Sequence, residues 1–317
     1  MYSNHVITSV LEIPALFAAF ATSVGMDVDT SSPDQPVVSA PSPTGAIAFR
    51  MRATVASQSH SVILEAVDAP EVTSLAYTRS PILDDVTTSP TSVSFIGDLL
   101  PEPYIATVVH YGPSVFRHLY YGNLQKLGDF TGGEVIAATC GPVAKLTGNM
   151  SYRDNLYLAN AYQRHSAAAN SGGVHVVHAD NPEPWRYFYG PISLNPMTGF
   201  TGKEAIGGFG DDINDGYLAR GRSPFSGVNV LHPVNIYATE PIVGDTSFRP
   251  LGCLAGVRMV NIQDLPVGAR IDIGGEYWRC YPAISRRSET IQPKGVNNWR
   301  SFESSYWVGY AYSEGPV

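Results

Sequence analysis

The chain has 317 residues and a net charge of −8, with 44% hydrophobic and only 15% charged residues. This length fits one large β-rich domain or two ordinary domains, with enough apolar residues for a sizeable core. Its dispersed arginines give no concentrated positive surface, so we expect no nucleic-acid partner. Because typical soluble domains carry roughly 25% charged residues, the low charge favours a surface covered by neighbouring subunits in an assembly.

Residues 6–24 form a long apolar stretch, interrupted by Glu12 and Pro14. No Lys or Arg precedes it, so it lacks the basic region that opens a secretory signal. It also falls short of the roughly 20 uninterrupted apolar residues of a membrane span, and we expect no membrane insertion. Pro14 suits the first turn of a short helix that continues through Phe20.

Residues 25–45 are rich in Asp, Ser, Pro and Gly. Such a composition buries little apolar area, so we expect an extended arm or linker. Because the first cation of the chain is Arg50, this acidic arm suits a basic partner surface. A strap across its own domain or across a neighbouring subunit is the alternative. With the apolar stretch, it forms a first region at 1–45.

The remaining chain predicts a β-rich domain at 46–173 and a second at 174–317. Short alternating segments bounded by Pro, Gly, Ser and Asp are typical of antiparallel β proteins. The expected fold is therefore mainly β, with antiparallel sandwich or barrel-like sheets, one or two short helices and the extended N-terminal arm. The segments expected as strands are 46–53, 61–67, 93–96, 105–110, 115–121, 134–139, 174–177, 186–189, 228–231 and 236–238.

One further helix is predicted at 152–169, where Ser151 and Asp154 form a capping box and Asn170-Ser171-Gly172-Gly173 ends the pattern. The aromatic content of this segment leaves a strand as the alternative. Near the C-terminus, residues 249–312 form an aromatic hairpin module. Gly274-Gly275 predicts its hairpin turn, because both residues can adopt positive φ. Tyr277 and Arg279 should then share one face, and Trp278 and Cys280 the other.

No motif predicts a catalytic residue or a cofactor. His175 and His178 would point to opposite faces of a strand, so a hydrogen-bonded or surface pair is favoured over a metal site. Three acidic residues in one loop are weak candidates for a calcium site, although an acidic turn explains them as well: Asp211, Asp212 and Asp215. The odd number of cysteines, Cys140, Cys253 and Cys280, favours free buried thiols over a disulfide.

Large aromatic side chains are the candidates for contacts with other subunits, since aromatic residues are enriched where proteins bind each other. Packing in the core of the chain is the alternative for all of them, and stacking on sugar rings is another. The candidate interface residues are Trp185, Tyr187, Tyr189, Trp278, Trp299, Tyr306, Trp307 and Tyr310.

Three segments of the C-terminal module carry a resemblance to a known class of proteins. They are the Pro-Leu-Gly-x-Leu-x-Gly-Val pattern at 250–257, the Gly-Gly-x-x-Trp hairpin at 274–278 and the closing Ser-x-Tyr-Trp-Val-Gly-Tyr-Ala-Tyr segment at 304–312. Together with residues 178–199, this part of the chain resembles the C-terminal region of virion structural proteins of tailed bacteriophages.

The resemblance implies a tail, baseplate, collar or fibre-attachment component, made in the host cytoplasm and located in the virion. Its partners would be copies of itself and other virion proteins, joined through extended arms and aromatic β-surfaces, and it would not be an enzyme. A carbohydrate-binding or receptor-binding β module on the particle is the first alternative. A glycan hydrolase is the second, because a pair of carboxylates can be assembled from distant parts of a chain.

Overall fold

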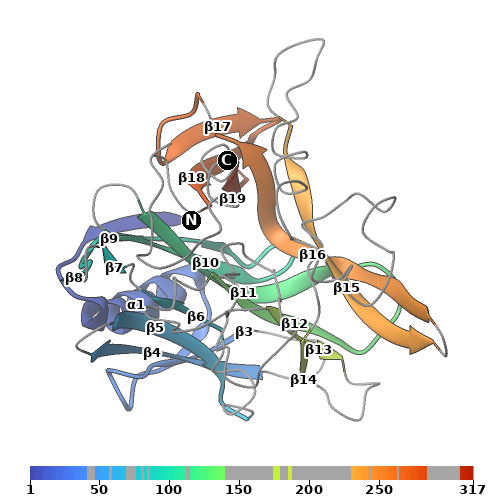
Figure 1. Ribbon diagram of the computed structural model, residues 1–317, viewed down its shortest axis with the longest axis horizontal. Coiled ribbons are helices and arrows are strands. Elements are labelled where there is room, and N and C mark those ends of the chain that lie inside the picture. The colour runs from blue at the N-terminus through green and yellow to red at the C-terminus, as the bar shows by residue number, and fades with distance from the viewer. Residues whose placement is uncertain are drawn as a thin grey trace.

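The computed structural model describes residues 1–40, 47–56, 59–68, 76–79, 82–83, 86–111, 115–139, 174–178, 185–187, 230–242, 245–262, 264–283 and 308–316. Over these residues the protein is built from antiparallel strands with one α-helix, α1 (Figure 1). The prediction of a mainly β fold with antiparallel, curled sheets and a short helix is confirmed.

The centre of the molecule is an antiparallel sheet whose strands β9 to β12 pair in chain order. Strand β1 adds to its edge by pairing with β9, and β9, β10, β11 and β12 then follow in order. The strands of this central sheet are β1 (Tyr2–Val6), β9 (Pro90–Asp98), β10 (Tyr104–Tyr111), β11 (Val115–Lys126), β12 (Gly132–Ala138), β13 (Val174–His178) and β14 (Trp185–Tyr187).

The C-terminal strands continue the same sheet, because the last residues of β11 pair with β16. From there the order is β16, β19, β18 and β17. Strand β15 pairs with β16 along the opposite edge from β11 and β19. These strands curl above the central sheet in Figure 1. They are β15 (His232–Ile242), β16 (Asp245–Asn261), β17 (Ala269–Ile273), β18 (Glu276–Pro282) and β19 (Val308–Pro316).

A separate five-stranded sheet lies below the central sheet in Figure 1, with the order β2-β3-β4-β5-β6. A short two-stranded pair, β7 (Ile82–Leu83) and β8 (Val86–Thr87), follows it in the chain. The five strands are β2 (Asp27–Asp29), β3 (Val37–Ala40), β4 (Ile47–Ala56), β5 (Ser59–Ala66) and β6 (Ala76–Arg79).

Most of the strand predictions are confirmed within a few residues. The exception is 228–231, because Val230 and Leu231 precede β15, which begins at His232. Strand β15 runs through Pro233, and its register with β16 shifts between Pro233 and Asn235. A proline has no N–H to donate to the ladder, so a local irregularity accommodates it. The predicted helix at 152–169 lies outside the described residues.

Helix α1 (Ile13–Val24) confirms the predicted helix and continues four residues beyond Phe20. Pro14 lies in its first turn, and Gly25 ends it with a φ of 98°. A short 3-10 turn, η1 (Val10–Glu12), leads into the helix through a capping box formed by Ser9 and Glu12. The Ser-x-x-Glu pattern that marks this capping box is visible in the sequence.

The acidic segment at 25–45 is bound to its own chain, as far as the structure describes it. Strand β3 pairs with β4, and β2 pairs with β3 at the edge of the five-stranded sheet. Of the two alternatives for this segment, the strap across its own domain therefore holds for residues 26–40. The two short strands β2 and β3 were not predicted, because the residues on either side of them are typical of turns.

The central sheet is buried on both faces, so its strands alternate between two hydrophobic cores. Phe95, Ile105 and Leu119 point to a lower core shared with α1 and the five-stranded sheet. Tyr104 and Tyr120 point to an upper core shared with the C-terminal strands. The period of two along each strand produces this division.

Candidate functional site

The aromatic residues expected at an interface are, where the structure describes their side chains, part of the core. Tyr310 is 0% exposed and lies in the upper core, and Trp278 is 6% exposed in a smaller cluster on the opposite face of the C-terminal strands. Both faces of β18 and β19 are thus packed. For Trp278 and Tyr310 the structure selects core packing over the interface expected from the sequence.

The structure does not describe the side chains of the other interface and calcium-site candidates. Trp185 and Tyr187 belong to β14, and the structure describes only their backbone. The remaining candidates lie outside the described residues: Tyr189, Trp299, Tyr306, Trp307, Asp211, Asp212 and Asp215.

The upper core contains a set of buried tyrosines whose hydroxyls bond across strands. Tyr120 donates to the carbonyl of Ala255 at 3.0 Å, and Tyr281 donates to Ser94 Oγ at 2.9 Å. The Tyr104 hydroxyl donates to the carbonyl of Ser313. Burial raises the pKa of Tyr104, Tyr120 and Tyr281 well above the ordinary value of 10.0. Each hydroxyl therefore stays protonated and acts as a hydrogen-bond donor between layers.

His118 joins the central sheet to the last two strands. Its Nε2 lies 2.9 Å from the carbonyl of Pro282, which can only accept, so Nε2 carries the proton. Nδ1 then accepts from the Tyr312 hydroxyl at 2.7 Å. Burial is the main reason that the pKa of His118 falls to about 4, and the nearby Arg117 lowers it further. The imidazole is 0% exposed, so this His–Tyr pair acts as a structural link between strands.

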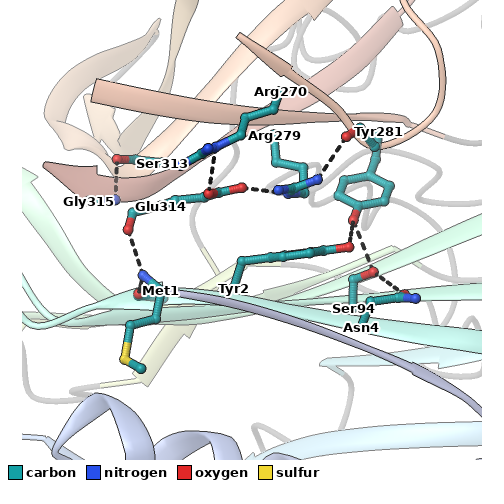
Figure 2. Close-up of polar contacts among 12 residues, drawn as sticks. Met1, Tyr2, Asn4, Ser94, Arg270, Arg279, Tyr281, Ser313, Glu314 and Gly315 are labelled. Carbon is teal, nitrogen blue, oxygen red and sulfur yellow. Dashed lines mark hydrogen bonds and ion pairs between the residues drawn. The ribbon is translucent and has the colours of Figure 1, made fainter. Parts of the chain in front are cut away.

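A cluster of charged side chains fastens the β17–β18 hairpin to the rest of the sheet, as Figure 2 shows. Glu314 on β19 accepts from Arg279 Nε at 2.5 Å and forms an ion pair with Arg270 Nε at 3.1 Å. The Arg279 guanidinium lies 3.6 Å above the Tyr2 ring, and the Met1 ammonium donates to the Glu314 carbonyl at 2.6 Å. The hairpin is therefore held against both β19 and β1.

The same hairpin presents an exposed strand at the border of the sheet. Among the described strands, β17 pairs only with β18, and it lies at the outer edge in Figure 1. Arg270 and Asp272 are exposed, and Ile273 is 46% exposed. The Arg270 guanidinium lies 3.4 Å from the centre of the Tyr277 ring. An edge strand exposes unpaired backbone groups, which makes it a template for another chain.

The turn of this hairpin has the geometry predicted from its two glycines. Gly274 and Gly275 have φ values of 66° and 90°, so both occupy the left-handed region that a tight two-residue hairpin requires. The Gly275 N–H donates to Asp272 Oδ1 at 3.0 Å, which stiffens the turn. As predicted, Trp278 and Cys280 are buried on one face while Tyr277 and Arg279 are half-buried on the other.

The described residues contain no group of three or more His, Cys, Asp or Glu side chains arranged to hold a metal ion. Cys253 on β16 and Cys280 on β18 are free, and β19 lies between their strands in the sheet. None of the described helices is long and apolar enough to cross a bilayer.

No protein-family model matches the chain, and a search of curated proteins finds no match. Two observations remain that bear on function: the contacts of the described residues, and the resemblance of the C-terminal segments to virion structural proteins of tailed bacteriophages.

Proposed function

We propose that the protein is a non-enzymatic structural subunit of a tailed-phage virion, which joins neighbouring subunits through the edges of its β-sheets. The observation that carries this proposal is the rigid, exposed hairpin formed by β17 and β18. Its outer strand β17 pairs, among the described strands, with β18 alone, and Glu314 fixes the hairpin to the body of the protein through Arg270 and Arg279.

The chemistry of this hairpin fits association with protein. Arginine and tyrosine are enriched at protein interfaces, and Arg270 stacked on Tyr277 presents both in a fixed arrangement. A strand that adds to an open edge gains main-chain hydrogen bonds, while side chains set the register. Because the hairpin is preorganised, little conformational entropy would be lost on binding.

The buried titratable groups of the upper core also support a structural role, because they are used in hydrogen bonds within the protein. Tyr104, Tyr120, Tyr312 and His118 are all within a few per cent of complete burial, and their polar atoms bond to other parts of the chain. They hold the C-terminal strands on the central sheet. Their arrangement supports a stable platform for the exposed hairpin.

Two measurements test this function. We expect purified protein to form oligomers whose mass rises with concentration in light scattering, and we expect mass spectrometry of purified phage particles that encode the chain to find it in stoichiometric amounts. Absence of the chain from such particles would refute the proposal. Binding to a glycan array by a monomeric chain would favour the receptor-binding alternative instead.

A further inference from the structure

Strand β17 has a sequence that is complementary to itself when two copies run antiparallel. It reads Ala269-Arg270-Ile271-Asp272-Ile273, with a cation and an anion placed symmetrically about Ile271. Around a two-fold axis at Ile271, Arg270 of each copy faces Asp272 of the other. Contacts related by a two-fold axis occur twice, so a single favourable pairing counts double.

The hairpin turn decides which backbone groups of β17 are available. In a two-residue hairpin, the residues next to the turn, Ile273 and Glu276, form a hydrogen-bonded pair, and such pairs alternate with non-bonded pairs along the ladder. Ile271 opposite Trp278 is therefore bonded to β18. Arg270 and Asp272 direct their N–H and C=O groups away from β18, toward the edge at which no described strand pairs.

Charge selects one register among those that these backbone groups allow. An antiparallel partner copy can place Arg270 opposite Arg270, Asp272 opposite Asp272, or Arg270 opposite Asp272. The first two registers bring like charges together, which destabilises a strand pair. The third forms two Arg–Asp pairs and leaves Ile271 opposite Ile271 at the centre.

The two faces of β17 agree with this register. Ala269, Ile271 and Ile273 share one face, so the two copies would bring Ile271 against Ile271 and Ile273 against Ala269. Ile273 is 46% exposed and Ile271 is half-buried, so pairing would remove apolar surface from water. On the other face, Arg270 uses Nε for Glu314, and a guanidinium has further N–H donors for a second carboxylate.

From these observations we infer that β17 is the contact through which two copies of this chain join edge to edge, with Arg270 of each copy paired to Asp272 of the other. This inference rests on the proposed function and names one contact within it. The pairing extends the C-terminal sheet across the two-fold axis and makes the aromatic module part of a continuous sheet.

The test is a charge exchange at the two positions. Asp272→Arg gives a copy with two cations on the strand, and Arg270→Asp gives a copy with two anions. Each variant alone would face like charges, and we expect its association to be at least about tenfold weaker than that of the wild type. An equimolar mixture restores two Arg–Asp pairs, so we expect heterodimers in native mass spectrometry.

Two control variants separate the loss of the Arg270–Asp272 pairs from changes in net charge and in the hairpin turn. Asp129→Arg makes the same change in net charge at an exposed residue in the turn between β11 and β12, and it should leave association unchanged. Asp272→Asn keeps an oxygen that can accept the Gly275 N–H, so it removes the charge and preserves the turn. Circular dichroism establishes that each variant is folded.

A cysteine cross-link tests the register of the two β17 strands by a method that does not depend on charge. Ile271→Cys would place two thiols opposite each other in a non-bonded pair, where Cα atoms lie about 4.5 Å apart and a disulfide fits. We expect a covalent dimer on mild oxidation, and much less from Ile273→Cys, whose partner would be Ala269. The wild type, oxidised under the same conditions, is the control for cross-linking by the natural cysteines.

The outcomes distinguish this contact from the proposed function. If the wild type forms oligomers, but the charge variants associate normally and the Ile271→Cys variant does not cross-link, β17 is not the contact and the structural role survives. If the wild type stays monomeric and is absent from particles, both proposals fail. Restored association in the mixture, with cross-linking of the Ile271→Cys variant, would establish the β17 pairing.

Discussion

The two cores on either face of the central sheet differ in how they hold the protein together. The lower core is built mainly from Phe, Ile, Val, Leu and Met side chains, with only two buried tyrosines, Tyr111 and Tyr121. At its centre Phe95 packs against Phe17 and Phe20 of α1. The upper core contains Tyr104, Tyr120 and other buried tyrosines. Apolar packing depends on area and shape, whereas each buried hydroxyl also requires a matched partner.

This difference explains why the C-terminal strands hold one arrangement on the central sheet. A slip of β19 relative to β11 would separate Tyr312 from His118 and leave both polar groups buried without a partner. The lower core depends more on hydrophobic packing, which tolerates substitutions of similar volume. The lower core thus contributes mainly stability, and the upper core adds specificity to the position of the hairpin module.

The largest effect is expected from the lower core. Phe95→Ala removes a ring that is 0% exposed and contacts α1, so we expect the free energy of unfolding to fall by about 3–5 kcal/mol. Chemical denaturation measures this loss. Phe95→Leu is the control, and it should lose less stability because it keeps more of the buried apolar volume. A loss for Phe95→Ala no larger than that of the control would contradict the role of this ring.

The next effect belongs to the upper core and depends on pH. The pKa of His118 is lowered to about 4 from the ordinary value of 6.5, so between these values the unfolded chain binds more protons than the folded one. The stability that depends on a neutral His118 is therefore fully present above about pH 6.5 and is lost as the pH falls to about 4. The free energy of unfolding should fall by about 3 kcal/mol over this range.

Denaturation of the wild type and of His118→Gln between these pH values measures that contribution. Glutamine can accept and donate but does not titrate here, so the difference between the two proteins should shrink by about 3 kcal/mol as the pH falls. A difference that stays constant with pH would show that His118 is not buried in its neutral form.

A smaller effect is expected when only the partner of His118 is removed. Tyr312→Phe leaves the ring in place but deprives Nδ1 of its donor, and we expect a loss of about 1–3 kcal/mol at neutral pH. A double-mutant cycle with His118→Phe isolates the interaction, because Tyr312→Phe should then lose little further stability. Equal losses in both backgrounds would be inconsistent with the hydrogen bond.

The smallest effect concerns the cap that begins the helical segment beside the lower core. Ser9 Oγ accepts the Leu11 N–H at 3.2 Å, and Ser9→Ala should reduce stability by about 1 kcal/mol. Ser9→Asp keeps an acceptor and serves as the control. The two variants should differ in melting temperature, and identical values would argue against a capping role.

The local features of the protein could be predicted from its sequence. Pro14 marks the first turn of α1, Gly274-Gly275 marks the hairpin turn, and the period of two marks most strands. These features depend on the geometry of a few neighbouring residues. The Ser9–Glu12 capping box, which was not among the predictions, is a local pattern of the same kind.

Features that depend on distant parts of the chain could not be predicted in this way. Strands β2 and β3 have the composition of a linker, and pairing with β4 is what orders them. Trp278 and Tyr310 are of residue types that are common at protein interfaces, but each lies on a strand that is packed on both faces.

The sequence by itself determined a β-rich chain, its turns, its one described α-helix and the alternation of side chains along each strand, because these follow from local backbone preferences. Only the tertiary structure decided that the aromatic side chains of Trp278 and Tyr310 face inward and that β17 lies at the border of the sheet formed by the described strands. Burial and strand order depend on which distant segments cover each face, and no local pattern contains that information.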